Sequence, residues 1–292
     1  AILKRTVEGE PRFGKLGLAI GMFEFQVNRL TREFHADVMK YMDEAFAQAF
    51  HTRGTSQMRT IPIHEEVLPE RRVGTYDGAK SLVMESDGPF VVVNCVCRQG
   101  MDLQETPCRQ TDIRETCLVL GDWATMVVEA GGGREISREE MVGFLDRANE
   151  IGMVLQPQNI QKPNFICCCC GCCCGVLSTA KKLPSPADFF DTNYFAEVQE
   201  DLCDGCMTCG DRCLMEAISY QDSVASVDLR RCIGCGLCVT TCPQEALRLT
   251  EKPEPKNPPR NEEALYRHIM AERFGPLGTA RIAAKKMLGM KI

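Results

Sequence analysis

Apolar residues recur at helical spacing in two stretches of the chain. The first follows Thr31, a residue that can cap the first turn of a helix. Its apolar face consists of Phe34, Val38, Tyr41, Met42, Ala45, Ala49 and Phe50. The second begins with the Ser-x-x-Glu capping box of Ser137 and Glu140 and ends at Gly152. We therefore predict helices over 31–50 and 138–151.

Shorter apolar runs have the length and composition of strands. Residues 90–94 (Phe-Val-Val-Val-Asn) are apolar enough for a buried strand, and residues 59–63 and 153–156 are further candidates. A polar, proline-containing stretch at 181–188 and four prolines within 251–260 indicate breaks between units. The pattern predicts an α+β protein with five parts. These are an N-terminal helical region (1–58), a Cys-rich α/β middle domain (59–180), a small cluster domain (189–250), a proline-rich linker (251–260) and an amphipathic tail (261–292).

Charge and hydropathy narrow the functional classes. The net charge of −6 argues against a nucleic-acid partner, because such proteins normally carry a basic domain. No run of 18 apolar residues predicts a transmembrane helix, and no secretory signal is visible, so we expect a cytoplasmic protein. No glycine-rich phosphate loop is present, and the four histidines (His35, His51, His64 and His268) are scattered.

The 19 cysteines are the unusual feature of the composition. They fall into tight groups with gaps of two or three residues, whereas disulfide scaffolds are small and space their cysteines widely. This grouping favours metal ligation by thiolates.

Eight of the cysteines form a repeated C-x2-C-x2-C-x3-C motif, the second copy 29 residues after the first. Three thiolates in a tight turn can reach three irons of a cubane, and the fourth points toward the neighbouring cluster. We therefore expect crossed ligation. The first cluster would be bound by Cys203, Cys206, Cys209 and Cys242, and the second by Cys232, Cys235, Cys238 and Cys213.

Over residues 203–250 the sequence resembles the two-cluster bacterial ferredoxins. The resemblance implies a small fold of β-hairpins and short helices, two 4Fe–4S clusters and low-potential electron transfer. Leu214 departs from the pattern, since proline usually follows the fourth cysteine there. Zinc knuckles are the alternative, but zinc sites use pairs of C-x2-C rather than a third and fourth cysteine in the same run.

Eleven further cysteines precede this repeat. Cys95 and Cys97 stand in a C-x-C-Arg segment that ends with Arg98, followed by the isolated Cys108 and Cys117 and by seven cysteines within 167–174. The arrangement resembles longer ferredoxin-type proteins of anaerobes, in which C-x-C-Arg and CC-Gly-CCC segments precede the ferredoxin repeat. We expect a third 4Fe–4S cluster in this region, and a fourth is left open.

The sequence offers two candidate sets of ligands for the third cluster. The simplest set is Cys95, Cys97, Cys108 and Cys117. The alternative draws jointly on that set and on Cys167, Cys170 and Cys173, which share the spacing of a cluster loop. Cys95 and Cys97 could instead be small buried hydrophobes, and Arg98 could offset cluster charge or be a surface cation.

The leading functional hypothesis is an electron-transfer subunit that serves a partner oxidoreductase and is not itself catalytic. The alternatives are an enzyme with a substrate-binding cluster in the middle domain, and a redox or iron sensor. The tail carries five basic residues from Arg273 onward and no acidic ones. We expect it to dock on a partner subunit, with peripheral membrane contact as the weaker reading.

Overall fold

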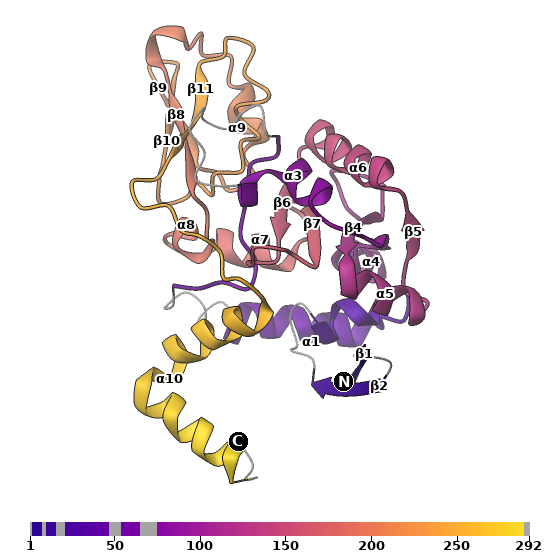
Figure 1. The fold of residues 1–292 in the computed structure, drawn as a ribbon. Helices are drawn as coiled ribbons and strands as arrows, with labels where there is room; N and C mark the ends of the chain where they lie inside the picture. Colours follow the sequence, from indigo (N-terminus) through magenta and orange to yellow (C-terminus); the bar gives the residue numbers. More distant parts are fainter. Residues whose placement is uncertain (1, 8–9, 16–20, 47–53, 65–74, 289–292) are drawn as a thin grey trace.

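The computed structural model describes residues 2–7, 10–15, 21–46, 54–64 and 75–288. Helices and antiparallel strands are mixed, so the α+β prediction is confirmed. Figure 1 shows the ferredoxin region as a separate lobe beside the middle domain, with the last helix running away from both.

The centre of the middle domain is a five-stranded antiparallel sheet with the order β5-β3-β4-β7-β6. Its strands are β3 (Phe90–Asn94), β4 (Glu115–Leu120), β5 (Arg134–Ile136), β6 (Val154–Pro157) and β7 (Phe165–Cys169). The strands expected at 90–94 and 153–156 are thus present. The segment at 59–63 is not a strand, because Ile61 N–H bonds to Leu155 while Ile63 N–H bonds to Cys235, and this change of partner prevents a continuous ladder.

Helices cover both faces of this sheet because successive residues of a strand point to opposite sides. Val92 and Leu118 face the core that includes α6 (Arg138–Ile151), whereas Val91 and Val119 face α5 (Gly121–Glu129). The predicted caps of α6 are confirmed: Ser137 accepts a hydrogen bond from Glu140 N–H at 3.1 Å, and Gly152 has a φ of 86°. The described part of the domain also contains the short α-helices α3 (Ala79–Met84), α4 (Val96–Leu103) and α7 (Gly175–Lys181).

The N-terminal region is helical only in part. It opens with a hairpin of β1 (Ile2–Val7) and β2 (Glu10–Lys15), which the prediction of a helical region missed. Helix α1 (Arg32–Tyr41) begins at the expected cap, where Thr31 accepts from Phe34 N–H at 3.2 Å, and a π-helical turn, Met42–Phe46, extends it. Ala49 and Phe50 of the predicted helix lie outside the described residues.

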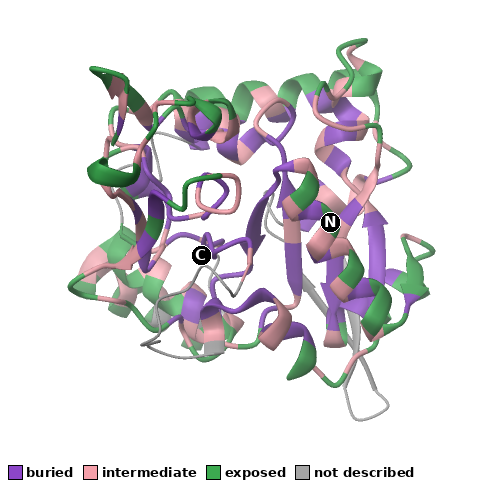
Figure 2. Ribbon diagram, turned by 90° about the horizontal axis from the view of Figure 1, so that it is seen from above, coloured by how far each residue is buried: buried purple, intermediate pink, exposed green. Residues whose placement is uncertain are grey.

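The ferredoxin region contains two small antiparallel sheets. One pairs β8 (Tyr194–Val198) with β11 (Leu247–Glu251), and the other pairs β9 (Ile218–Gln221) with β10 (Val224–Val227). The short helix α9 (Thr208–Arg212) follows the first cysteine loop, and α8 (Pro186–Phe189) precedes the domain. Ile233 and Leu237 are buried in the core of the middle domain, so the two regions share packed surface. Figure 2 shows this buried interior with the exposed residues at the rim.

The proline-rich segment is extended but is held on the protein surface. Gln161 donates its N–H to the Pro259 carbonyl at 2.9 Å, and Asn193 Oδ1 accepts from Lys256 N–H at 2.8 Å. Helix α10 (Glu262–Met287) follows and bends at Gly275, which has a φ of 65°. None of the described helices combines the length and apolar character needed to cross a bilayer.

Candidate iron–sulfur and thiolate sites

Four cysteines from both copies of the ferredoxin motif line one hollow. We call them the first ferredoxin set: Cys203, Cys206, Cys209 and Cys242. The first three come from the loop and helix that precede β9, and Cys242 arrives from the second motif, about 30 residues further along the chain. Cys206 is exposed, whereas Cys209 is buried, so this set lies close to the protein surface.

The remaining four cysteines of the repeat line a second hollow. This second ferredoxin set consists of Cys213, Cys232, Cys235 and Cys238. Val154 of the middle-domain strand β6 also lines this hollow, so the second set faces the interior of the molecule. Each hollow offers four thiols, which suits a 4Fe–4S cluster.

A Glu-Ala pair follows the fourth cysteine of each motif, as Glu216-Ala217 and as Glu245-Ala246. Glu216 and Glu245 both have positive φ angles (53° and 51°), and the alanine after each donates its N–H to the fourth cysteine of its motif. Ala217 N–H reaches Cys213 Sγ and Ala246 N–H reaches Cys242 Sγ, both at 3.3 Å. Such N–H groups stabilise thiolate charge and tune a bound cluster.

Two glycines allow the cysteine loops to pass close to other backbone. At Gly205 (φ 72°) a Cβ would lie 2.5 Å from the Ser223 carbonyl oxygen, and at Gly234 (φ 64°) one would lie 2.3 Å from the Tyr194 carbonyl oxygen. Only glycine fits at both positions.

Burial raises the pKa values of three thiols of the second ferredoxin set. It raises the pKa of Cys235 to about 12 and also raises the pKa of Cys232 and Cys238. These thiols are therefore protonated at neutral pH until a metal displaces the proton.

A third group of thiols lies in the middle domain and draws on two distant segments. This outer thiol group consists of Cys108, Cys170, Cys172 and Cys173, whose Sγ atoms all lie within 4.8 Å of one another. The Sγ of Cys108 is 3.7 Å from that of Cys170 and 3.5 Å from that of Cys172, and the Sγ atoms of Cys172 and Cys173 are 3.6 Å apart.

Seven further thiols border an apolar cavity of about 280 Å³ between the sheet and the N-terminal region, which Cys170 of the outer thiol group also lines. These cavity thiols are Cys95, Cys97, Cys117, Cys167, Cys168, Cys169 and Cys174. Phe23, Phe25 and Trp123 are among the other lining residues. Cys117 and Cys167 are direct partners in the pairing of β4 with β7. Hydrogen bonds from the Cys117 and Cys169 thiols hold the pKa of Cys167 well below its ordinary value, despite its burial.

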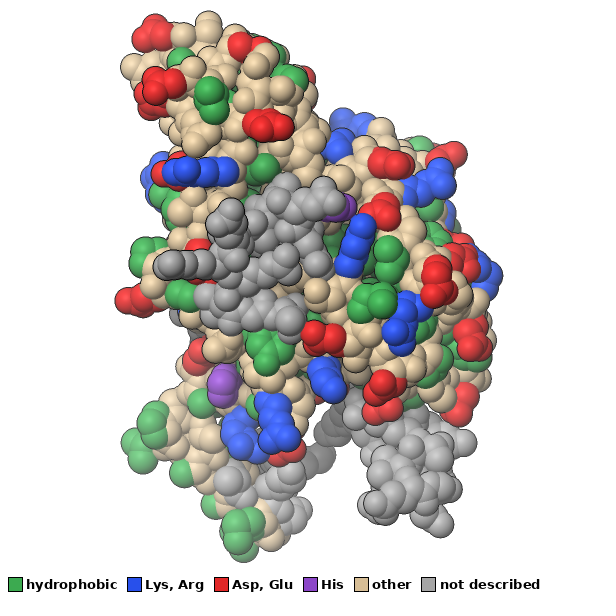
Figure 3. Space-filling model, turned by 45° about the horizontal axis from the view of Figure 1, so that its top comes forward, with side chains coloured by type: hydrophobic (Ala, Val, Ile, Leu, Met, Phe, Trp, Pro, Cys, Tyr) green, Lys and Arg blue, Asp and Glu red, His purple; other side chains and the backbone are tan. Residues whose placement is uncertain are grey.

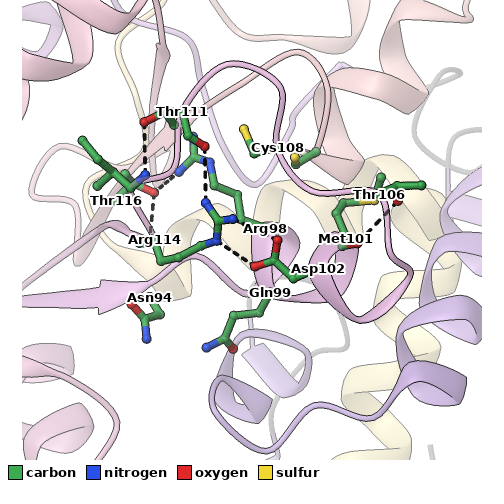
Figure 4. Close-up of polar contacts among 12 residues, drawn as sticks. Asn94, Arg98, Gln99, Met101, Asp102, Thr106, Cys108, Thr111, Arg114 and Thr116 are labelled. Carbon is green, nitrogen blue, oxygen red and sulfur yellow. Dashed lines mark hydrogen bonds and ion pairs between the residues drawn. The ribbon is translucent and has the colours of Figure 1, made fainter.

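Arg98 lies between the outer thiol group and the cavity thiols. Its side chain is fully buried and bonds to the Thr116 hydroxyl, to the Cys168 carbonyl oxygen at 3.3 Å and to Met153 Sδ at 3.5 Å. Burial opposes its charge, but the neighbouring thiolates, with Cys95 first and then Cys170, raise its pKa above the ordinary value. Arg98 is therefore not the surface cation of the alternative reading. Figure 4 shows it close to Cys108, with the Arg114–Asp102 ion pair alongside.

The simplest predicted set for a third cluster is divided by the fold. Cys95, Cys97 and Cys117 border the cavity, whereas Cys108 joins Cys170 in the outer thiol group. The predicted loop triad is divided as well, because Cys167 lies on strand β7 while Cys170 and Cys173 lie beyond its end.

Sequence reasoning missed four members of these two groups, Cys168, Cys169, Cys172 and Cys174. The signal that could have found them is the end of the apolar strand at Cys169. Cysteines two apart on a strand share a face, so Cys167 and Cys169 belong together. Those after the strand belong to a turn.

Comparison with known proteins agrees with the ferredoxin geometry. A model of the 4Fe–4S binding domain matches residues 225–248, which contain Cys232, Cys235, Cys238 and Cys242. Over 47 residues the chain is 40% identical to a subunit of the ion-translocating oxidoreductase complex of Methanosarcina acetivorans. That match covers 16% of this chain and 18% of the relative. The chain thus carries an iron–sulfur domain of the 4Fe–4S class at its C-terminal side.

Proposed function

We propose that this protein relays single electrons at low potential to or from a partner oxidoreductase, as a subunit of a larger complex. The observation that carries the proposal is the pair of four-cysteine hollows, each built from both copies of the motif. A 4Fe–4S cluster bound in each hollow supplies one-electron exchange. The chain's own residues hold the ligands, supply N–H groups to Cys213 and Cys242, and bury Cys232 and Cys238 of the second hollow.

The surface around the first ferredoxin set supports docking of a basic partner. Cys206 is exposed there, and Leu202 and Met207 beside it are about half exposed. Residues 194–251 contain ten acidic and four basic residues, a net charge of −6 that equals the net charge of the whole chain. Figure 3 shows acidic side chains over this lobe. An apolar contact ringed by acidic groups favours a partner with a positive rim.

We further propose a third 4Fe–4S cluster among the cavity thiols. The ligands would be Cys95, Cys97, Cys117 and Cys167. This set follows the alternative of the sequence analysis in which both cysteine segments supply ligands. Cys117 and Cys167 are paired across two strands, and Cys95 and Cys97 follow the adjacent strand β3. A buried cation, Arg98, is at hand to offset the charge of four thiolates.

The apolar cavity supports a second candidate function. Its volume of about 280 Å³ and its aromatic lining would suit a small apolar molecule beside a middle-domain cluster. This arrangement would make the protein an enzyme rather than a relay. The two functions differ in whether a small ligand changes the EPR signal of the middle-domain centre.

We also propose that the tail docks on the partner. The first half of α10 packs on the rest of the protein. Leu265 is buried, and Glu272 accepts a hydrogen bond from Thr55 N–H at 3.0 Å. Beyond Gly275, Leu277 and Met287 are exposed among basic residues. Membrane-surface contact is the weaker alternative, as few large apolar residues are available.

Anaerobic redox titration followed by EPR tests the relay, together with analysis of iron and acid-labile sulfide. We expect low-potential one-electron signals, 12 irons for three clusters, and loss of the middle-domain signal alone in Cys117→Ala. A redox-silent metal at the eight ferredoxin cysteines would refute the proposal.

A chain cut after Arg260 tests the role of the tail. It should keep its clusters and lose binding to its partner, whereas unchanged partner binding would show that the tail is not part of the interface.

A further inference from the structure

We propose that the outer thiol group binds one metal ion in tetrahedral four-sulfur coordination, as a centre of a different kind from the clusters. In such a site each sulfur lies about 2.3 Å from the ion, so the sulfurs lie roughly 3.8 Å apart. Three of the six Sγ separations are 3.5, 3.6 and 3.7 Å, and the other three are no longer than 4.8 Å. Thiolate quartets of this geometry select iron or zinc.

The same spacing argues against a cubane at this position. Each thiolate of a cubane binds its own iron, so its sulfurs stand further apart than sulfurs that share one ion. Among the described residues, the outer thiol group is the set whose ligand atoms all lie within 4.8 Å of one another. The ferredoxin cysteines instead border hollows.

The fold, rather than a flexible loop, brings the four thiols together. Strand β7 ends at Cys169, and helix α7 begins at Gly175, so Cys170, Cys172 and Cys173 occupy a turn that is fixed at both ends. Cys108 enters from the loop between α4 and β4, about 60 residues earlier in the chain. Three ligands from one turn and one from a distant segment make a closed site.

The charge of the surroundings supports an anionic centre. Arg98 lies next to Cys108 and Cys170, and its other hydrogen-bond partners are the neutral Thr116, Cys168 carbonyl and Met153. Its Nε has no hydrogen-bond partner among the described residues. A buried guanidinium needs a negative counterpart. A divalent ion bound by four thiolates carries a net charge of −2 and supplies it.

The turn that carries three of the proposed ligands packs on the residue that follows Cys213 of the second ferredoxin set. A Cβ at Gly171, between the ligands Cys170 and Cys172, would lie 3.4 Å from the Leu214 side chain. Leu214 directly follows Cys213, and it is the residue that replaces the usual proline of the motif. The residue that departs from the ferredoxin pattern therefore lies in contact range of the cysteine turn.

Metal and sulfide analysis of the full-length, anaerobically purified protein tests the inference. Clusters contribute one sulfide per iron, so the wild type should contain one metal ion, iron or zinc, in excess of its sulfide. Elemental analysis identifies the ion, and a high-spin ferric EPR signal in the oxidised protein would mark iron. This readout is independent of the proposed relay, whose failure would appear as missing sulfide.

Cys172→Ser removes a ligand that neither the ferredoxin sets nor the cavity thiols use. We expect it to lose that one ion with its sulfide unchanged, and Cys108→Ala, on the other segment, to do the same. Cys168→Ala is the matched control, a buried cysteine of the same run outside the outer thiol group, and it should keep the ion. Metal equal to sulfide in the wild type would overturn the proposal. So would loss of four irons with four sulfides in both variants.

Discussion

The ferredoxin region and the middle domain both gather thiols, but they do so by different means. In the ferredoxin region, three ligands of each set come from one loop, and the loop spacing is written directly in the sequence. In the middle domain, the thiols come from the segment after β3, from within β4 and β7, from the turn after β7 and from the loop that carries Cys108. The comparison teaches that a local motif predicts its ligands, whereas a site assembled across a sheet depends on strand pairing.

The two regions also compensate thiolate charge differently. Backbone N–H groups of Ala217 and Ala246 serve the ferredoxin sets. The middle domain uses the side chain of Arg98. A backbone donor is repeated whenever the motif is repeated. The single buried Arg98 instead lies beside both the outer thiol group and the cavity thiols and offsets the charge of both.

The largest expected effect tests the crossed ligation of the ferredoxin region. Cys213→Ala should remove the cluster held by Cys232, Cys235 and Cys238, because Cys213 lines that hollow and not the one bordered by its own motif. About four irons and four sulfides should be lost, as measured by chemical analysis and EPR. If the second cluster persisted and the first changed, the crossed assignment would be wrong.

A smaller effect tests the contact surface between the middle domain and the ferredoxin region, which we call the seam. Arg59 and Asp77 form an ion pair with side chains only 4% and 7% exposed, and Asp77 also accepts from Asn193 at 2.9 Å, next to β8. Arg59→Met should lower the free energy of unfolding by about 3–5 kcal/mol, because it leaves a buried carboxylate unpaired.

Urea denaturation of the cluster-loaded protein, followed by circular dichroism, measures this change. The control is Arg134→Met, which breaks half-exposed pairs with Glu115 and Glu140 and should lower the free energy of unfolding far less, because solvent screens exposed ion pairs. Equal losses in the two variants would contradict a role for burial at the seam.

The smallest expected effect separates the two ferredoxin sets from each other. Asp204 accepts a hydrogen bond from Cys206 N–H at 3.1 Å, beside the exposed edge of the first set. Asp204→Asn keeps an acceptor and removes a negative charge, so it should raise the potential of the first cluster by on the order of tens of millivolts. Redox titration should show the second cluster unchanged, and Asp87→Asn in the middle domain should shift neither. A shift of both clusters by the same amount would show that the two sets do not differ in their exposure to this charge.

Several features were determined by the sequence alone. The helix caps at Thr31, Ser137 and Gly152 were predictable because capping depends on residues within one turn. The buried strand β3 was predictable from its apolar run. The eight ferredoxin cysteines were predictable as a group because their spacing reflects the shape of a cubane.

Only the tertiary structure decided the remaining features. The segment at 59–63 has the composition of a strand, but its N–H groups bond to two different regions and form isolated bridges. The run of cysteines at 167–174 offers many possible sets of ligands, and the division depends on where β7 ends. The partners of Cys108 and the burial of Arg98 follow from contacts across 60 residues or more of chain, which no local pattern records. Spacing encodes a site that one loop can build, and strand pairing and burial decide a site built from several segments.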